Sequence, residues 1–271
     1  MKLVFFCPHW GSGALAPEVF VSRVREAGYD GVELAATDPD PVVERLAALA
    51  REAGLQLIMQ HWDTQMRDLS AHLAQFERRL RYAASFNPLF INSHTGRNLF
   101  TLDENRRVFA RASAVAAETG LPIVHETHRG RCCHTAWRTA ELLRAEPSVR
   151  IALDMSHWCC VSESLLEDQA DFIQTVVPHV DHIHARVGWA QGPQVSDPRA
   201  PEWQTALDAH LAWWDRCVAH KRATGAARLT ITPEFGPPPY LPVLPYTQQP
   251  VASQWDINVH MMNLLRARYR G

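Results

Sequence analysis

A short apolar run leads directly into charged and imidazole side chains at residues 121–131, LPIVHETHRGR. Its first four residues are typical of a buried parallel strand, and the polar residues begin where such a strand would end. Because side chains alternate along a strand, Glu126 and His128 point to the same side as Val124. The pattern therefore predicts a carboxylate and an imidazole together at one strand end.

The same arrangement recurs along the chain, because other apolar runs also end in carboxylates, imidazoles or a guanidinium. These strand-end residues are His9, Glu33, His61, His94, Glu126, His128, Asp154, His157, His182, His184, Arg186 and Glu234. Such groups cannot be buried together without a compensating cation or shifted protonation. A divalent metal ion is the simplest compensation, although a single acidic residue at a strand end is more often a helix cap or a loop ion pair.

The order of the expected elements predicts how these strand ends meet. Eight strands are expected, one beginning at Leu121 and the others at 3–7, 31–34, 55–59, 89–92, 149–153, 180–185 and 229–232. A helical pattern follows each strand, at 20–27, 43–50, 69–83, 101–119, 136–145, 166–177, 203–218 and 253–268. This alternation is typical of an α/β protein with a closed (β/α)8 TIM barrel, in which all strand carboxyl ends open on one face. No linker divides the chain, so residues 1–271 are expected to form one domain.

Local signals support these helices. Asp40 before Pro41 is a predicted helix cap, and Thr101 with Glu104 forms a predicted capping box. An open doubly wound sheet is the structural alternative. However, no glycine-rich phosphate-binding fingerprint follows the first expected strand, which disfavours that sheet.

The composition limits the classes of partner. The 271 residues carry a formal net charge of -2 and show no basic run, so nucleic acid is not an expected partner. The amino terminus, MKLVFFCPHWGSG, has too few apolar residues for an export signal or a membrane span, and a cytoplasmic protein is expected. The six cysteines show no CxxC spacing, so we expect reduced thiols.

Four segments, VHETHRGR, LDMSHW, HIHARVG and TPEFG, occur in this order at four expected strand ends. In these residues the chain resembles the xylose isomerase-like barrels, a superfamily of sugar isomerases, sugar epimerases and endonuclease IV. The resemblance covers essentially the whole barrel. Through the epimerase branch it implies one divalent metal ion, held by Glu126, Asp154, His184 and Glu234. It also implies substrate contacts by His157 and Arg186.

This ligand set implies an expected chemistry. Three carboxylates and one imidazole suit Mn2+, Mg2+, Co2+ or Zn2+, and such a cation can acidify the carbon between a carbonyl and a hydroxyl group of an open-chain sugar. In the family, Glu126 and Glu234 would then move that proton as an acid/base pair through an enediolate. The resemblance therefore implies a sugar isomerase or epimerase with a small-molecule carbohydrate substrate.

Two other activities on the same barrel are alternatives, a metal-dependent lyase or dehydratase and an endonuclease IV-like phosphodiesterase. Elimination of a β-substituent from the same enediolate would give the lyase. The phosphodiesterase interpretation lacks the Asp-x-His pair that endonuclease IV carries after strand seven. Only Lys2 and Lys221 are present, neither at a strand end, which disfavours the hydride shift of true xylose isomerases.

Further side chains are expected around the pocket. We expect His61, His94 and His128 to contact substrate, with His61 and His94 facing the pocket; the alternative for each is a hydrogen-bonded structural histidine. Trp10 and Trp62 follow the first and third strands, where aromatic faces either stack on a sugar or close the barrel top.

Three loop arginines and three helical tryptophans each allow two interpretations. Arg97, Arg129 and Arg131 lie in loops on the same face and could hold a phosphate or carboxylate of the substrate, but solvated loop charges are favoured. The tryptophans at 203, 213 and 214 share one helix with core spacing, which indicates internal packing or a homo-oligomer interface.

Overall fold

The structure, a computed structural model, describes residues 1–270 and closes the expected strands into one parallel barrel. The strands are β1 (Lys2–Pro8), β2 (Gly31–Ala35), β3 (Gln56–His61), β4 (Ile91–Ser93), β5 (Ile123–Glu126), β6 (Ile151–Leu153), β7 (Val180–His184) and β8 (Arg228–Thr232). Each strand pairs with its neighbours in sequence order, and β8 pairs with β1, which closes the sheet. The predicted (β/α)8 TIM barrel is therefore confirmed.

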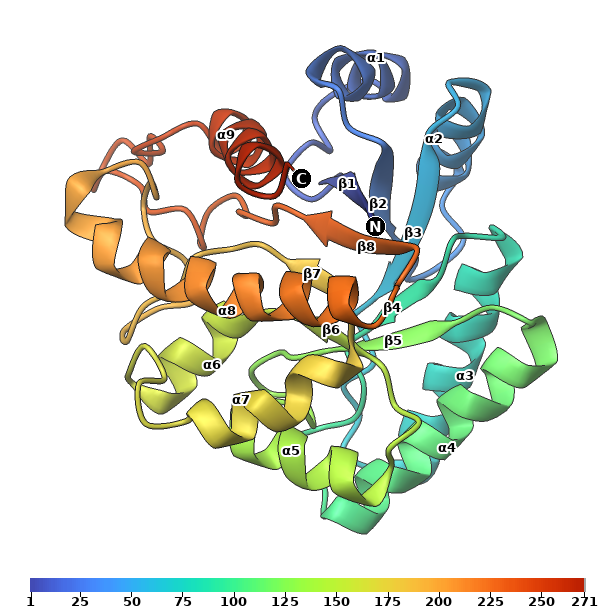
Figure 1. The fold of residues 1–271 in the computed structure, drawn as a ribbon. Coiled ribbons are helices and arrows are strands. Elements are labelled where there is room, and N and C mark those ends of the chain that lie inside the picture. The colour runs from blue at the N-terminus through green and yellow to red at the C-terminus, as the bar shows by residue number, and fades with distance from the viewer. Residues whose placement is uncertain (271) are drawn as a thin grey trace.

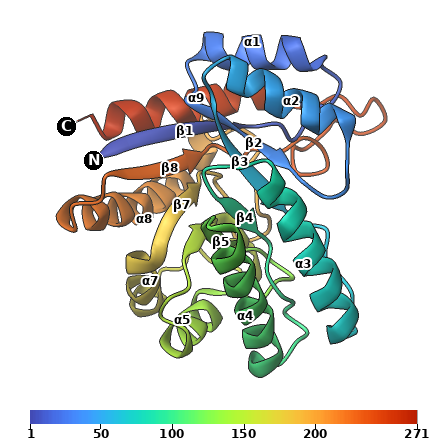
Figure 2. The ribbon, with the colours of Figure 1, turned by 90° about the vertical axis from the view of Figure 1, so that its right-hand side faces the viewer.

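Helices surround the barrel. Figure 1 shows them arranged around its outside, and Figure 2 shows the same arrangement turned by 90°. They are α1 (Pro17–Ala27), α2 (Pro41–Glu52), α3 (Leu69–Ser85), α4 (Leu102–Thr119), α5 (Ala136–Ala145), α6 (Met155–Ser162), α7 (Ala170–Val176), α8 (Gln204–Ala223) and α9 (Gln254–Arg268), with 3-10 turns η1 (Val177–His179) and η2 (Pro201–Trp203). Because every strand runs in the same direction, the loops that follow the strands meet at one end of the barrel.

Two helix starts follow the sequence signals. The Asp40 side chain accepts a hydrogen bond from the Val42 amide at 2.8 Å and caps α2. At α4, the Thr101 amide donates to the Glu104 carboxylate at 2.8 Å, and the Glu104 amide donates to the Thr101 hydroxyl at 3.2 Å. The predicted cap and capping box are both confirmed.

Helix α6 departs from the sequence prediction, which placed one helix between the sixth and seventh strands. It begins directly after Asp154, whose Oδ1 accepts a hydrogen bond from the Ser156 amide at 2.9 Å. Its sequence, MSHWCCVS, is buried along most of its length. A buried helix lacks the amphipathic pattern by which a surface helix is predicted, so α6 was missed.

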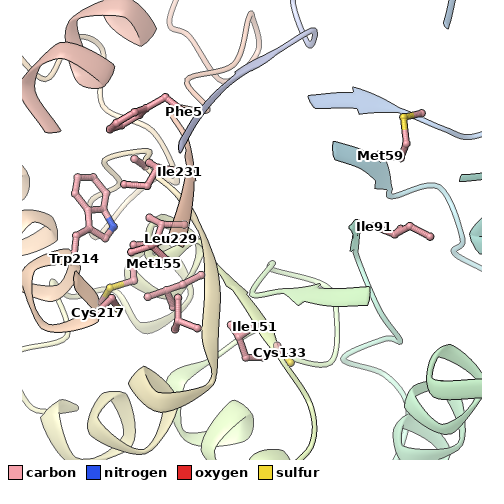
Figure 3. Packing of buried hydrophobic residues seen from close by; sticks show 14 of the residues in the cluster. Phe5, Met59, Ile91, Cys133, Ile151, Met155, Trp214, Cys217, Leu229 and Ile231 are labelled. Carbon is pink, nitrogen blue, oxygen red and sulfur yellow. The ribbon is translucent and has the colours of Figure 1, made fainter. Parts of the chain in front are cut away.

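Apolar side chains form two layers. The larger layer lies between the strands and the helices, and Figure 3 shows part of it, with Trp214 of α8 beside Leu229 and Ile231 of β8. A smaller cluster lies inside the barrel and consists of Val4, Phe6, Ile58, Phe90, Val124 and Ala152. These inward residues form an apolar floor beneath the strand ends.

Polar residues follow this floor at the next inward position of several strands. Gln60 comes two residues after Ile58, and Glu126 comes two residues after Val124. Because side chains alternate between the two faces of a strand, both polar residues also point into the barrel. The barrel interior therefore changes from apolar to polar along the strands.

The remaining expectations concern cysteines, tryptophans and membranes. All six cysteines are free, in agreement with the prediction of reduced thiols. Trp214 is buried in the core, and the ring of Trp203 packs 5.2 Å from that of Trp189, so both contribute to internal packing. Within residues 1–270, no helix combines the length and the apolar character needed to cross a bilayer.

Gly31 begins β2, the strand that carries Glu33. A Cβ atom at this position would overlap the ring of Phe6 and the main-chain oxygen of Gln56. We expect Gly31→Ala to lower the free energy of unfolding by about 1–3 kcal/mol, the usual cost of overpacking. Chemical denaturation followed by circular dichroism measures this change. Gly13→Ala, where the added carbon has no neighbour within 4 Å, is the control, and equal stabilities of the two variants would contradict the prediction.

Candidate metal centre and active site

Four predicted ligands, each from a different strand end, meet in the barrel mouth. Glu126 ends β5, Asp154 follows β6, His184 ends β7, and Glu234 lies two residues after β8. None is more than 4% exposed, and each offers a ligand atom within 4.8 Å of the others. His184 Nδ1 lies 3.0 Å from Glu234 Oε2 and 3.4 Å from Glu126 Oε2. The structure thus brings these residues together, and their binding of a metal stays a prediction.

A further buried acidic residue, Glu33 of β2, orients the His184 ring. Glu33 Oε1 lies 3.1 Å from His184 Nε2, and the Thr232 hydroxyl donates to Glu33 Oε2 at 2.6 Å. Because Nε2 faces this carboxylate, Nδ1 is the atom that can take a metal. A carboxylate behind the outer nitrogen is the usual partner of a ligating histidine. The sequence indicated Glu33 as a polar strand-end residue but gave it no role.

The concentration of charge in the mouth shifts the pKa values of its members. Burial alone would lower the pKa of His184, but the carboxylates of Glu234, Glu33 and Glu126 raise it well above its usual value. Burial alone would raise the pKa of Glu126, but His94 and His184 hold it well below its usual value. At neutral pH the mouth therefore favours the carboxylate form of Glu126 and a cationic neighbour.

The donor set fits a divalent cation. The buried carboxylates of the mouth are Glu33, Glu126, Asp154 and Glu234, and within residues 1–270 Arg186 is the buried guanidinium that pairs with two of them. Glu126 Oε1 and His184 Nδ1 have no hydrogen-bond partner among residues 1–270. Because such buried atoms are costly to leave unpaired, a cation bound to both would stabilise the site. Carboxylate oxygens with one imidazole suit Mn2+, Mg2+, Co2+ or Zn2+.

A cavity of about 530 Å3 borders these residues. Its walls include the carboxylates of Glu126 and Glu234 and the rings of Trp10, Trp62 and Tyr240. Trp10 is 38% exposed and Trp62 43% exposed, so both indoles lie at the rim of the cavity. A cavity of this volume, with aromatic walls and a few convergent polar groups, is typical of a small-molecule site.

Arg186 connects the candidate ligands to the aromatic rim. Its Nη2 donates to Asp154 Oδ2 and lies 2.8 Å from His157 Nε2. The ring centroids of Tyr240 and Trp10 lie 4.9 and 5.8 Å from the guanidinium carbon. Arg186 lines the cavity, whereas the fully buried His157 packs behind it. Of these two residues, Arg186 is therefore the one that borders the cavity.

Three histidines from successive strand ends lie side by side. The ring centroids of His94 and His128 are 4.3 Å apart, and those of His128 and His157 are 3.8 Å apart. His94 and His128 line the cavity, and His94 Nε2 lies 2.9 Å from Glu126 Oε2. His94, Glu126 and His128 also offer ligand atoms within 4.8 Å of one another. This row forms one wall beside the candidate metal centre.

His61 faces away from the cavity. Its buried ring lies 5.2 Å from the ring of Phe76 in α3, and its two nitrogens lie 3.0 Å from Ser93 Oγ and 2.8 Å from Thr64 Oγ1. The prediction that His61 faces the pocket and contacts substrate is therefore wrong. The physical reason is the alternation along β3, which directs Gln60 into the barrel and His61 towards the helices.

Two side-chain amides beside the candidate ligands were missed by the sequence analysis. Gln60 Nε2 donates to Glu126 Oε2 at 3.3 Å and to Glu234 Oε1 at 3.1 Å. Asn92 Nδ2 donates to Glu126 Oε2 at 2.8 Å. Each amide stands two residues after an inward apolar residue, Ile58 or Phe90, so strand alternation was the signal that could have found them.

The three loop arginines differ in burial. Arg129 is exposed and Arg97 is half-buried, in keeping with loop charges. Arg131, however, is only 5% exposed and lines the cavity, with its guanidinium donating to the main-chain oxygens of Trp62 and Thr64. The interpretation of Arg131 as a solvated loop charge is therefore wrong.

Comparison with known proteins identifies the family. Residues 21–233 match the family described as xylose isomerase-like TIM barrel. The chain belongs to this family. No curated protein matches the sequence.

Solved structures of several other proteins share the fold. A 3-keto-D-glucoside 4-epimerase from E. coli is 17% identical with a TM-score of 0.64, covering 98% of this chain and 100% of that chain. A xylose isomerase-like TIM barrel protein from Mycobacterium smegmatis, in complex with magnesium, is 12% identical with a TM-score of 0.65, covering 98% of each chain. A probable 3-DHS dehydratase from Bacillus anthracis is 17% identical with a TM-score of 0.58, covering 97% of this chain and 98% of that one. At these identities the similarity is one of fold.

The contact between Glu33 and His184 in this xylose isomerase-like barrel leads to a prediction on metal affinity. Glu33→Gln keeps the size of the side chain but removes the charge that faces His184 Nε2. We expect it to weaken Mn2+ binding by about 10–100-fold, the usual effect of losing such a partner. Calorimetric titration of the metal-free protein measures the affinity. Glu52→Gln, on an exposed position of α2, is the control, and equal affinities would exclude this role of Glu33.

The raised pKa of His184 leads to a prediction on pH. The raised pKa of His184 favours its protonated form at neutral pH, whereas a bound cation needs the lone pair of Nδ1. Metal binding should therefore release about one proton near pH 7, and affinity should fall as the pH is lowered. Calorimetry with Mn2+ in buffers of different ionisation enthalpy counts the released protons. Binding without proton release at this pH would contradict the prediction.

Proposed function

We propose that the protein is a divalent-metal-dependent isomerase or epimerase that acts on a sugar or sugar derivative by proton transfer. The observation that carries the proposal is the convergence of Glu126 and Glu234 with Asp154 and His184 at one side of a cavity sized for a small molecule. The four ligand atoms lie within 4.8 Å of one another, close enough to share one ion. A small-molecule carbohydrate is the proposed partner.

Glu126 and Glu234 are the proposed acid/base pair. When bound, the metal ion would polarise a carbonyl group of the substrate and acidify the adjacent C–H bond. Glu126 suits the role of base, because its carboxylate form is favoured at neutral pH. Glu126 ends β5, and Glu234 follows β8, which lies three strands further round the barrel. Glu234 therefore approaches from another side of the barrel. Removal of a proton by one glutamate and its return by the other would invert a carbon centre.

Gln60 is suited to hold the Glu126 and Glu234 side chains in a fixed relative position. Its Nε2 donates to one oxygen of each glutamate, at 3.3 Å for Glu126 and 3.1 Å for Glu234. A donor shared between two carboxylates limits their motion and reduces their mutual repulsion. Glu126 Oε1 stays available for a cation or a proton, whereas Glu234 Oε2 faces His184 Nδ1 at 3.0 Å and Arg186 Nη2 at 3.5 Å. Gln60 is therefore a proposed positioning residue.

Polar and aromatic side chains around the cavity are the proposed substrate contacts. Arg186 is a fixed donor because Asp154 and Glu234 hold its guanidinium, and His94 and His128 present ring nitrogens that can bind hydroxyl groups. The remaining proposed contacts at the cavity are Trp10 and Trp62, whereas His157 does not line the cavity and is proposed to act through Arg186, whose Nη2 lies 2.8 Å from His157 Nε2. Indole faces at the rim can cover the C–H face of a sugar and exclude water from a reactive intermediate.

The comparisons support this class of reaction without choosing within it. The structures of similar fold include a sugar epimerase, a barrel in complex with magnesium and a probable dehydratase. Epimerisation and dehydration can share the first step, removal of a proton next to a carbonyl group. A dehydratase would then expel a leaving group, whereas an epimerase returns the proton. The reaction products distinguish the two.

The proposed proton transfer predicts that solvent deuterium enters the substrate. We expect the Mn2+-loaded protein in D2O to place deuterium on the carbon next to the carbonyl group of at least one member of a ketose panel, as followed by NMR. Glu126→Gln and Glu234→Gln should each lower the rate by at least about 100-fold, because each removes a positioned acid/base group. The measurement is made at saturating Mn2+, with bound metal counted for every variant.

Glu52→Gln, which keeps the site intact, is the control for this experiment. Full exchange in either site variant would remove that glutamate from the mechanism. Elimination products in place of deuterated sugar would favour the dehydratase. Exchange that persists after removal of bound metal by a chelator would contradict metal dependence.

A further inference from the structure

Three arginines are buried in the described part of the chain, residues 1–270, and they differ in how their charge is balanced. Arg79 pairs with Asp63 at 2.7 Å, and Arg186 pairs with Asp154. Arg131 is only 5% exposed, yet within residues 1–270 no carboxylate oxygen lies within 4.0 Å of its guanidinium. Because a buried charge without a counter-ion is costly, Arg131 needs an explanation.

The contacts of Arg131 satisfy some of its donors but not its charge. Nη1 and Nη2 donate to the main-chain oxygens of Thr64 and Trp62, which are neutral acceptors. A guanidinium has five N–H donors, so others remain for a ligand. Burial, and secondly the nearby Arg97, lower the pKa of Arg131 to about 10, although the charges of Glu126 and Asp63 act in the opposite direction, and the guanidinium is still charged at neutral pH. A fixed cation with free donors therefore borders the cavity.

The surroundings of Arg131 supply no carboxylate in direct contact, although Glu126 and Asp63 are close enough to raise its pKa. Trp62 and Gln65, from the loop after β3, line the cavity with it. Arg97 donates to the main-chain oxygen of Gln65 and brings a second guanidinium to the same loop. The acidic residues of this loop are Asp63, whose carboxylate is taken by Arg79, and Asp68, whose carboxylate caps α3 by accepting from the Ala71 amide. This side of the cavity is therefore cationic, whereas the candidate metal centre is rich in carboxylates.

We propose that Arg131 is the binding site for an anionic group of the substrate, either a carboxylate or a phosphate. The inference rests on the proposed function only in taking the cavity as the substrate site. A carboxylate or phosphate would place a negative charge in direct contact with Arg131, where no carboxylate of residues 1–270 lies within 4.0 Å. The planar guanidinium matches either group in geometry. The substrate class is thus a sugar acid or a sugar phosphate in place of a neutral sugar.

A purely structural role for Arg131 makes a different prediction. In that role, the guanidinium only ties the loop after β3 to the loop after β5 through the carbonyl groups of Trp62 and Thr64. Its loss would then weaken every ligand of the cavity to the same degree. An anion site instead predicts a loss confined to charged ligands, so matched pairs of probes separate the two roles.

The experiment uses the full chain loaded with Mn2+ and two pairs of probes. The pairs are D-gluconate with D-glucitol, and D-ribulose 5-phosphate with D-ribulose, and calorimetry measures each dissociation constant. We expect the anionic member of at least one pair to bind at least about tenfold more tightly, as a charge-assisted hydrogen bond of about 1.5 kcal/mol or more would give. The pair with the larger ratio identifies carboxylate or phosphate as the natural group. No preference in either pair would overturn the proposal.

Two variants test the residue itself. Arg131→Gln should remove the preference for the anionic probe and leave the affinity for the neutral probe within about twofold. Arg129→Gln is the matched control, because it removes the same charge from an exposed position of the same loop, and it should keep the preference. Equal weakening of both members of a pair by Arg131→Gln would show a structural tie and overturn the proposal.

If circular dichroism shows that Arg131→Gln does not fold, Arg131→Lys decides the question. Lysine keeps the charge but loses the planar fork, so the preference for the anionic probe should fall by at least about threefold. An unchanged preference would overturn the proposal. Because the affinity difference between gluconate and glucitol does not depend on turnover, absence of deuterium exchange would count against the proposed function and not against this site.

Discussion

The structure depends on holding several carboxylates together inside a closed barrel. Glu33, Glu126, Asp154 and Glu234 are all buried, and the mutual repulsion of such groups opposes folding unless positive charge and hydrogen bonds offset it. The barrel offers these compensations from several strands at once. Arg186 pairs with Asp154, and amides from β3 and β4 donate to the glutamates.

The apolar floor determines where the buried polar groups below the barrel mouth find their hydrogen-bond partners. Because the inward residues below the mouth are apolar, buried polar groups there must find partners within the barrel. His182 Nε2 lies 3.5 Å from Glu33 Oε2, and its Nδ1 lies 2.8 Å from Thr230 Oγ1. Thr230 in turn donates to the main-chain oxygen of Asp181 at 3.2 Å. The network that begins at the candidate metal centre therefore ends on the backbone, and the position of the His184 ring is tied to the sheet.

The fold could be predicted from sequence because its signals are local. Apolar runs of strand length alternate with helical patterns, and the capping residues Asp40 and Thr101 mark helix starts that do not depend on the rest of the chain. The meeting of four strand ends then follows from closure of the barrel. Helix α6 was missed because burial of most of its length removes the period that distinguishes one face from another.

The site was harder to predict, because side-chain direction and counter-ions depend on tertiary structure. In β3 each face carries both apolar and polar residues, so alternation relates Gln60 to Ile58 and His61 to Met59 but does not say which of the two faces points inward. The burial of Arg131 depends on a loop from a different strand folding over it. Tyr240, which lies beside Arg186, comes from a long loop without a periodic pattern. These residues share one property, that their neighbours are distant in sequence.

Asp154 divides its two oxygens between two tasks. Oδ1 accepts from the amide and hydroxyl of Ser156 at the first turn of α6, while Oδ2 faces Arg186 and the candidate ligands. An aspartate on a longer or freer loop could adapt its side chain to ions of different radius, but this one is clamped by the helix it starts. The position of the Asp154 carboxylate is thus fixed by the start of α6. Selectivity among cations of different radius therefore depends partly on backbone geometry.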